Sequence, residues 1–533
     1  MPGSSVSYRA VTGGSGMTDE IELKLALAPD ALKRLQRHPL LRSLAAGRRL
    51  RKAMLQSTYF DTPDRKLAKR LMALRVRSDG RRFVQTLKAP RNDGVGGLQE
   101  MTEDEVEVAG AQPEPAKVSE PAAAALLAEP GVAETLGPVF ETQVERKALP
   151  IRLIDSEVEV AFDEGQIVAD GRSQPVCEAE LELKSGRPER LVQLALTLHE
   201  QVDFRLLSES KAERGFALAE DREPQPRLAQ RIDLPEQATA GDCLVAIVRS
   251  CLGQLQANER ALLAGSQDPE AVHQLRVSVR RLRAAVGCFR PIMTESAANE
   301  LADGLDWLQS ATGAARDWDV FRLETLTPLL RRLPEDEGLR ALVHRVDECR
   351  ERAHTAALAA LADRRFTGLM LRLVLLIQDR AWQRPPEPGQ LVGPAEEPGH
   401  LFAVDQLAKR TRAVLKRGRD RNDADESSLH ELRIACKKLR YTIEFFRTFV
   451  SKAKSRGALD GLKELQECLG SLNDAAVGQR LLAQAGEGGT KPSEARALGL
   501  VQGWQASRIE QDLGHLRRSW KRAKHSLSAL IED

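Results

Sequence analysis

The sequence predicts a multidomain α+β protein, with an N-terminal antiparallel β-barrel tunnel and flanking helices followed by an all-α, internally duplicated region. Two observations predict this fold class. Between residue 20 and about residue 219, short segments alternate apolar and polar residues, which is the period of half-buried strands. Beyond residue 240 the apolar period is helical, and two blocks of sequence recur at one constant spacing.

The composition sets limits on the partners and the cellular setting. The chain has 533 residues, of which 42% are hydrophobic and only 4% aromatic, and this favours Leu- and Ala-rich helices for the larger part. The formal net charge is +2, so a charged partner has to be recognised by a local patch. The seven cysteines form no Cys-x-x-Cys pair, which predicts reduced thiols in a cytoplasmic protein. No apolar run reaches the roughly 18 residues of a membrane span, so no membrane partner is expected.

The first predicted strand, residues 20–25, places acidic and basic side chains on one face. Its polar face consists of Glu20, Glu22 and Lys24, and its apolar residues share the other face. Residues 178–184 repeat this plan with the polar face Glu178, Glu180, Glu182 and Lys184. Neighbouring carboxylates repel one another, and a divalent metal with a phosphate chain would neutralise them, because hard cations take oxygen ligands. Several such strands predict a closed barrel with a charged, hydrated interior.

The other N-terminal elements follow the same reasoning. Residues 71–77 and 82–88 flank a turn at 78–81 and predict a hairpin. Residues 103–108 and 157–163 alternate again, whereas residues 29–36, 122–127 and 188–201 fit helices. Arg75 and Arg77 share one strand face, and Lys88 shares a face with Thr86, so basic side chains are available to bind phosphate oxygens.

Breaks in the pattern predict the domain boundaries. Residues 1–17 form a Gly- and Ser-rich disordered lead, residues 18–220 the strand-rich domain and residues 221–240 a linker rich in proline and charge. The helical region, residues 241–533, contains a Pro/Gly-rich linker at 384–400 between repeats at about 241–383 and 401–533.

Two blocks of sequence define this duplication. Residues 272–283 (VHQLRVSVRRLR) align with 429–440 (LHELRIACKKLR) at an offset of 430 − 273 = 157. Residues 305–320 align with 462–477 at 462 − 305 = 157. One offset held across two separate blocks indicates two copies of one helical unit.

Each copy contains a basic stripe at positions i, i+3, i+7 and i+10 of a predicted helix, which is one helical face. The stripes are His273, Arg276, Arg280 and Arg283 in the first copy and His430, Arg433, Lys437 and Arg440 in the second. Like charges in a row repel one another, so the pattern favours a polyanion ligand, and a solvated surface is the alternative. Nucleic acid is disfavoured, because Tyr441 is the one aromatic residue interleaved with these cations.

These motifs resemble two known families. The H-x-L-R-x-x-x-[RK]-[RK]-L-R pattern, present twice and followed by L-x-x-L-Q-x-x-x-G-x-x-x-D, resembles the CHAD family over residues 240–533. The E-x-E-x-K opening, Tyr59-Phe60-Asp61-Thr62 and the segment 210–215 resemble the CYTH superfamily over about residues 18–219. The resemblance implies a triphosphate tunnel followed by a pair of four-helix bundles that bind inorganic polyphosphate.

The resemblance also implies an activity and its residues. The activity is hydrolysis of inorganic triphosphate to pyrophosphate and phosphate, with Mg²⁺ or Mn²⁺ as cofactor. The implied catalytic residues are Glu20, Glu22 and Lys24, and the implied metal ligands are Glu20, Glu22, Asp163, Glu178, Glu180 and Glu182. The implied triphosphate-binding residues are Arg75, Arg77, Lys88, Arg146, Lys184 and Lys211. The eight residues of the two stripes would bind polyphosphate in a shared channel.

Two alternatives stay open. In the first, the chain is a non-catalytic, granule-associated adaptor that binds polyphosphate. In the second, the tunnel acts on ATP as an adenylate cyclase or nucleoside triphosphatase, although the sequence shows no evident adenine pocket. Two departures favour weaker phosphate binding or a different substrate length, because Met101 and Gln143 occupy positions where the CYTH family often has arginine.

Overall fold

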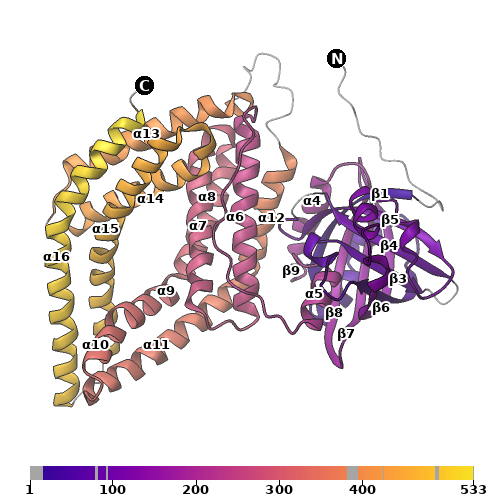
Figure 1. Cartoon of the computed structure of the whole chain (residues 1–533), viewed down its shortest axis with the longest axis horizontal. Helices are drawn as coiled ribbons and strands as arrows, with labels where there is room; N and C mark the ends of the chain where they lie inside the picture. The colour runs from indigo at the N-terminus through magenta and orange to yellow at the C-terminus, as the bar shows by residue number, and fades with distance from the viewer. Residues whose placement is uncertain are drawn as a thin grey trace. The chain divides into compact units, whose positions relative to one another are not determined.

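The computed structural model describes residues 16–78, 82–91, 94–380, 394–423, 425–486 and 491–531. They form two compact units, a β-barrel and a helical unit (Figure 1). The barrel unit comprises the described residues up to Pro224 together with Arg364–Asp379, and the helical unit comprises Gln225–Asp363 and the described residues from Arg380 onward. The predicted fold class, an antiparallel barrel followed by a helical region, is confirmed.

The barrel is closed by the pairing of its first strand on both sides. In spatial order its strands are β1 (Gly16–Ala26), β5 (Leu98–Val108), β4 (Phe83–Pro90), β3 (Ala73–Ser78), β2 (Arg51–Asp61), β6 (Gly137–Arg152), β7 (Glu157–Ala169) and β8 (Arg172–Ser185). All neighbours are antiparallel, and β1 pairs with both β5 and β8. A short strand, β9 (Arg205–Leu206), adds to the end of β1. The expected disordered lead, 1–17, has to be corrected at its end because β1 begins at Gly16; residues 1–15 lie outside the described part.

Alternation along the strands separates the barrel interior from its outer core. Outward residues such as Leu74 and Leu87 pack with Phe60 beneath helix α3 (Pro121–Leu127). Inward residues at one part of the interior are apolar, and there Tyr59 and Phe140 pack against helix α5 (Lys211–Ala219) through Phe216. The same inward faces are charged further along the strands.

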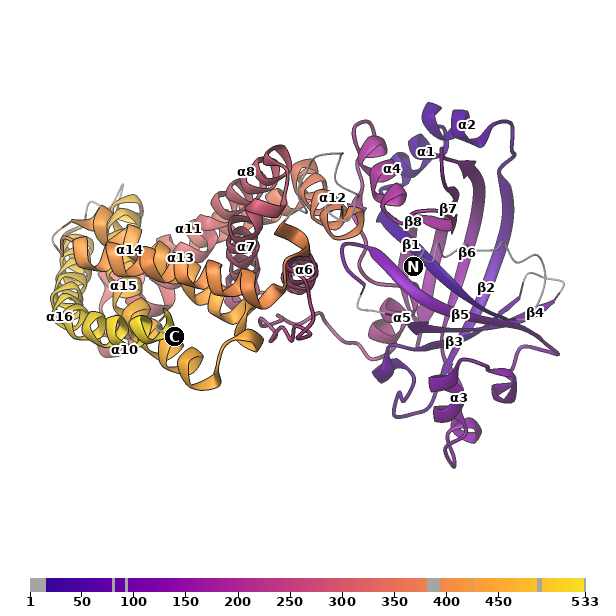
Figure 2. The ribbon, with the colours of Figure 1, turned by 90° about the horizontal axis from the view of Figure 1, so that it is seen from above.

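Two layers of helices lie on the strands β1 and β8. Helix α4 (Glu189–His199) packs on these strands, and helix α12 (Arg364–Asp379) packs on α4 and β9 (Figures 1 and 2). Helices α1 (Pro29–Gln36) and α2 (Pro39–Ala45) complete the unit. The expected first helical repeat, 241–383, is therefore corrected, because its last helix belongs to the barrel unit. Extended backbone at Asp363 ends the preceding helix and separates α12 from it.

The helical unit consists of two copies of one arrangement. The first copy contains α6 (Ala240–Leu263), α7 (Pro269–Phe289), α8 (Glu295–Ala311), α9 (Gly313–Val320), α10 (Thr327–Arg332) and α11 (Glu337–Ala362). The second contains α13 (Gly399–Asp420), α14 (Glu426–Phe445), α15 (Lys452–Gly486) and α16 (Pro492–Ile531). The starts of α7 and α14 differ by 426 − 269 = 157, and those of α8 and α15 by 452 − 295 = 157, which is the offset of the sequence blocks.

Local sequence explains where these helices begin. The side chains of Asp268 and Asp425 accept backbone N–H bonds at the starts of α7 and α14, so the same N-cap precedes each basic stripe. Thr239 and Asp242 form a capping box that starts α6 at the end of the expected linker 221–240. The expected linker 384–400 lies largely outside the described residues, and α13 already begins at Gly399. Among the described helices, none combines the length and apolar character needed to cross a membrane.

Candidate active site in the barrel and a cationic cluster in the helical unit

The charges inside the barrel are separated into two arcs. Four contiguous strands (β7, β8, β1 and β5) bear the inward carboxylates, and the other four (β4, β3, β2 and β6) bear most of the inward cations. The inward carboxylates include Glu20, Glu22, Glu103, Glu105, Asp163, Glu178, Glu180 and Glu182. The inward cations of the opposite arc include Arg75, Arg77, Lys88 and Arg146. This separation suits a ligand that combines a cation with a polyanion.

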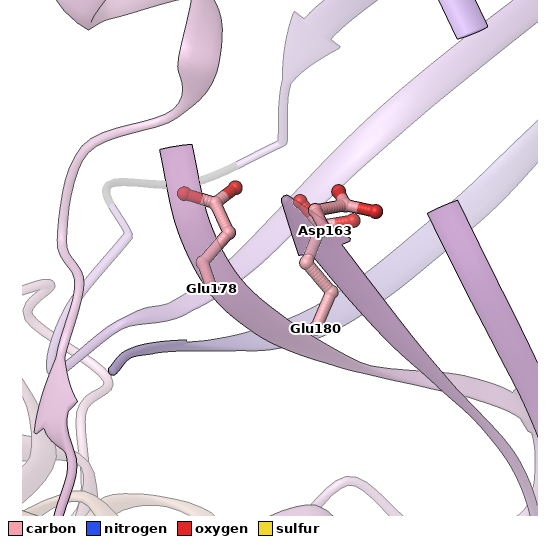
Figure 3. A group of neighbouring side chains, drawn as sticks. All are labelled: Asp163, Glu178 and Glu180. Atoms are coloured by element: carbon pink, nitrogen blue, oxygen red, sulfur yellow. The ribbon is translucent and has the colours of Figure 1, made fainter. Parts of the chain in front are cut away.

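Three buried carboxylates converge on the acidic arc. Oxygen atoms of Asp163 on β7 and of Glu178 and Glu180 on β8 lie within 4.8 Å of one another (Figure 3). The pairing of β7 with β8 places Asp163 directly opposite Glu178, which explains the proximity. Three of the six predicted metal ligands are thus brought together by the structure.

Basic side chains surround this carboxylate cluster. Arg146 donates to both oxygens of Asp163, with Nε to Oδ1 at 2.8 Å and Nη2 to Oδ2 at 2.6 Å, and it also contacts Glu180. Lys211 Nζ lies 2.7 Å from Asp163 and 2.8 Å from Glu180. Burial opposes ionisation of Asp163, but Lys211 and Arg146 outweigh it and lower the pKa of this carboxyl below its usual value.

The N-terminal strand contributes a second group of charges. Lys24 Nζ lies 2.8 Å from Glu22, and both side chains are buried. Lys88, on β4 two strands away, contacts Glu20 and lies 3.4 Å from Glu103 on the intervening strand β5. Burial opposes the charge of Lys88, whereas Glu103 and Glu20 raise its pKa above the usual value. Glu20 and Glu22 therefore reach the interior, as predicted, each beside a lysine.

Strand β3 supplies the least neutralised cation. Arg75 lies 3.6 Å from Glu103, but no carboxylate of the described residues forms an ion pair with Arg77, whose Nε finds no hydrogen-bond partner there. Burial, together with Arg75 and Arg146, lowers the pKa of Arg77 to about 10. Burial raises the pKa of Tyr59, but Arg75 and Arg77 outweigh this effect and lower it overall. An anionic ligand would relieve this excess of positive charge.

Glu182 and Lys184 lie toward a more open part of the acidic arc. The two side chains contact each other, and Lys184 is about half exposed. Burial and the neighbouring charge of Glu20 raise the pKa of Glu182 to about 7, although Lys184 opposes the shift. Glu22 lies opposite Glu182 in the β1–β8 register. These carboxylates are therefore less neutralised than those beside Lys211.

The donor set fits a hard divalent cation. All the candidate ligands are carboxylate oxygens, which Mg²⁺ and Mn²⁺ prefer, and no cysteine is among them. Asp163, Glu178 and Glu180 converge but are paired with cations, whereas Glu20, Glu22 and Glu182 lie on adjacent strands with less compensation. Both groups lie on the arc that faces the basic side chains.

The structure adds residues that sequence reasoning missed and reassigns one. Arg214 of α5 contacts Glu178, and Gln99 of β5 accepts a hydrogen bond from Lys24 at 2.5 Å. Met101 lies opposite Glu20 in the interior register, but Gln143 alternates away from the face of Arg146 and bonds Gln166 on the exposed side. The expectation that Gln143 occupies a phosphate-contacting position is therefore wrong. The recurring polar face of β5 was the signal that could have identified Gln99.

In the helical unit, the two predicted stripes meet through α7 and α14. Arg280 Nε donates to the hydroxyl of Tyr441 at 3.2 Å, which joins one copy to the other. We define the cationic cluster as the side chains near this junction that influence one another electrostatically. Its members are His273, Arg276, Arg280, Arg316, Arg433 and Lys437.

The cationic cluster is not neutralised by ion pairs with the described residues. Burial and the neighbouring Arg433 and Arg280 lower the pKa of Lys437 to about 7. Burial, with Arg316 and Arg280, lowers the pKa of His273 to about 4. Asp317 and Asp474, one from each copy, lie close enough for Asp474 to add to burial in raising the pKa of Asp317. The cations outnumber these two carboxylates.

The remaining stripe residues lie at the edge of the cluster. Arg283 pairs with Asp306, and Arg440 Nε donates to Glu444 at 2.8 Å; these two arginines are exposed. His430 is also exposed and contacts Asn473 at 3.3 Å. The structure thus brings five predicted stripe residues together and leaves three at the margin.

Comparison with known proteins gives the class of each unit. Residues 18–216 match the CYTH domain family, and residues 246–483 match the CHAD domain family. The chain therefore contains a CYTH domain followed by a CHAD domain, as the motifs predicted.

Individual relatives cover parts of the chain. An inorganic triphosphatase of Haemophilus influenzae is 34% identical over 206 residues, which are 38% of this chain and 55% of that protein. An uncharacterized protein of Mycobacterium tuberculosis is 26% identical over 273 residues, 48% of each chain. The matched regions thus span about half the length of these curated relatives. The crystal structure of the CHAD domain from Ricinus communis is 31% identical, with a TM-score of 0.47, over 56% of this chain and 96% of that one.

Proposed function

We propose that the barrel hydrolyses inorganic triphosphate to pyrophosphate and phosphate with Mg²⁺ or Mn²⁺. The observation that supports this most strongly is the opposition of the two charged arcs, with Arg77 lacking an ion-pair partner among the described residues. A basic wall binds phosphate oxygens, and a carboxylate wall suits a cation that bridges to them. The similarity of part of the chain to an inorganic triphosphatase points to the same substrate.

The side chains of the barrel have distinct tasks in this reaction. Arg75, Arg77 and Lys88 bind the phosphate chain from the basic arc, and Arg146 and Lys211 bind it beside the carboxylate cluster. A bound divalent ion would supply charge neutralisation to the phosphate oxygens. Water attacks a terminal phosphorus; a new P–O bond forms, the bridging P–O bond breaks, and pyrophosphate leaves with its electron pair. A carboxylate of the acidic arc accepts the proton of the attacking water.

The decisive experiment measures phosphate release from inorganic triphosphate with Mg²⁺, with Mn²⁺ and with EDTA, and in parallel from ATP and long-chain polyphosphate. We expect metal-dependent release from triphosphate. Release mainly from ATP would favour the nucleoside triphosphatase alternative, and cyclic AMP formation the cyclase. No release from any substrate would reject catalysis and leave the adaptor hypothesis.

We also propose that the helical unit binds inorganic polyphosphate through the cationic cluster. Its support is the convergence of six basic side chains from both copies, among them the neutral His273, with only two nearby carboxylates, Asp317 and Asp474. Burial and repulsion between neighbouring cations lower the pKa values of His273 and Lys437, and binding of a polyanion would offset the repulsion. Fluorescence anisotropy with labelled polyphosphate tests this, and absence of saturable binding at low salt would reject it. Association with polyphosphate granules in the cytoplasm would follow from such binding.

A further inference from the structure

A short segment, Phe204–Ser208, lies against the backbone of Lys24. Leu206 pairs with Leu25 in the β1–β9 register, and Leu207 N donates to the carbonyl of Lys24 at 2.9 Å. The amide of Lys24 donates to the carbonyl of Gly97 at 3.0 Å. The amide and the carbonyl of Lys24 are thus bonded by the start of β5 and by the segment around β9, along the edge of β1 that does not pair with β8.

Gln99 joins the side chain of Lys24 to the same segment. Its Oε1 accepts from Lys24 Nζ at 2.5 Å, and its Nε2 donates to the carbonyl of Ser208 at 3.1 Å. Gln99 is only 8% exposed and Lys24 only 4%, so water competes weakly for these bonds. An amide is the group suited to this place, because one end accepts from an ammonium and the other donates to a carbonyl.

Gly97 shows how closely the three parts approach. A Cβ atom at this position would lie 3.0 Å from the carbonyl oxygen of Lys24 and 3.3 Å from that of Leu207. The residue also has a φ of +79°, in the left-handed region that favours glycine. The strand start, Lys24 and the segment therefore form one tightly packed junction.

Helix α12 holds the outer side of the segment. Thr367 Oγ1 donates to the carbonyl of Phe204 at 3.1 Å, and the Thr367 side chain is buried. At the start of the helix, Arg364 lies 2.8 Å from Asp203, and its carbonyl oxygen lies 3.0 Å from His199 Nε2. The support for Lys24 thus includes a helix that follows residue 363, well beyond the segment 18–216 that matches the CYTH family.

We propose that Gln99 and Thr367 are positioning residues for Lys24. Gln99 orients the ammonium group directly, and Thr367 acts through the segment Phe204–Ser208. The expected effect on rate rests on the proposed hydrolysis and on Lys24 being a catalytic residue of it, as the E-x-E-x-K resemblance implies, but the structural part of the proposal does not depend on that activity. It makes α12 a component of the hydrolytic unit, although the sequence of α12 lies within the CHAD match.

Two substitutions in the full-length protein test it. Gln99→Met removes both hydrogen bonds at similar side-chain length, and Thr367→Val removes one hydroxyl at similar shape. We expect kcat/KM for triphosphate to fall about tenfold in the first variant and about threefold in the second, since each loses part of a positioned hydrogen-bond network. The matched control is Thr355→Val, because Thr355 Oγ1 makes a comparable bond to the carbonyl of Glu351 on an exposed face of α11.

Hydrogen exchange separates this proposal from the proposed activity. The amide of Leu207 should exchange at least about tenfold faster in both variants, while amides in the middle of β7 and the thermal midpoint stay near those of the parent. If Gln99→Met leaves both the hydrogen exchange of Leu207 and kcat/KM unchanged, Gln99 does not position Lys24. If Thr367→Val leaves both unchanged, α12 does not support Lys24. If the parent protein hydrolyses none of the substrates, the exchange measurement still decides the structural claim.

Discussion

Arg146 and Asp163 form a two-point ion pair across the β6–β7 pairing, with Nε–Oδ1 and Nη2–Oδ2 distances of 2.8 and 2.6 Å. The pair lies where the basic arc meets the acidic arc, because β6 and β7 are neighbours in the barrel. A second junction lies on the other side, where Lys88 on β4 contacts Glu103 on β5 at 3.4 Å. Between the two junctions on the basic side lies Arg77, without a carboxylate partner among the described residues.

Replacing Arg77 with glutamine should weaken triphosphate binding more than it harms the fold. The guanidinium is buried beside Arg75 and Arg146, so its removal relieves repulsion in the empty barrel and costs a phosphate contact in the occupied one. We expect KM to rise about tenfold or more, with a thermal midpoint equal to or above that of the parent. Arg70→Gln, at an exposed position of the same unit, is the control. An unchanged KM would place the substrate elsewhere.

The carboxylates of β1 can be tested by neutralisation at constant shape. Glu20→Gln and Glu22→Gln should each abolish turnover, because each removes a candidate metal oxygen that lies beside a lysine. The circular dichroism spectrum should remain that of the parent, which shows that the fold is intact. Glu100→Gln, on the outward face of the neighbouring strand, should retain activity. Turnover that survives in either β1 variant would remove that residue from the metal role.

The residues of the two stripes in the helical unit should not contribute equally to polyphosphate binding. The double charge reversal Arg276→Glu with Arg433→Glu places two negative charges in the cationic cluster and should abolish association with labelled polyphosphate. Triphosphate hydrolysis should remain within about twofold of the parent, because these residues lie in the other unit. Arg283→Glu with Arg440→Glu is the matched control, since both arginines are exposed and already paired with Asp306 and Glu444. Equal loss in both double variants would make the binding a general surface-charge effect.

Lys437 should make the stability of the helical unit depend on pH. Burial with Arg433 and Arg280 lowers its pKa from the ordinary 10.5 to about 7, while Asp474 and Arg276 also face it. The unfolded chain therefore binds more protons between these two values, and stability falls as the pH is lowered from about 10.5 toward 7. Lys437→Met should raise the thermal midpoint at pH 7 by about 2–4 °C and leave it nearly unchanged near pH 10.5.

Tryptophan fluorescence is a suitable probe for that measurement. Four of the five tryptophans, Trp307, Trp318, Trp504 and Trp520, lie on described helices of the helical unit, so their signal reports on that unit. The fifth, Trp382, lies outside the described residues. Lys524→Met, at an exposed position of α16, is the control, and its thermal midpoint should show no pH-dependent increase over that of the parent. If the thermal midpoint of Lys437→Met rises equally at both pH values, the stabilisation does not depend on the protonation of Lys437.

Local sequence patterns predicted the strands of the barrel and their inward faces better than the contacts between its charged side chains. Alternation in residues 20–25 and 178–184 was sufficient to place Glu20, Glu22 and Glu178 on inward faces, because side-chain direction in a strand has a fixed period of two. Alternation also places Gln143 and Arg146 on opposite faces of their strand. The prediction for Gln143 was wrong because it followed the position of an arginine in the CYTH family and not this alternation. Which of the inward carboxylates would converge depended on the β7–β8 register, and register follows from turn geometry and packing around the whole barrel.

The sequence by itself determined the two domains, the 157-residue duplication and the faces on which charges lie, because these depend on short-range periodicity and repetition. Only the tertiary structure decided which charges meet. It brought Arg280 to Tyr441 of the other copy, left Arg77 without an ion pair within the described part of the chain, and placed α12 in the barrel unit beside Phe204. Such contacts join residues far apart in the chain, and they depend on the summed burial of apolar surface, which no local pattern encodes.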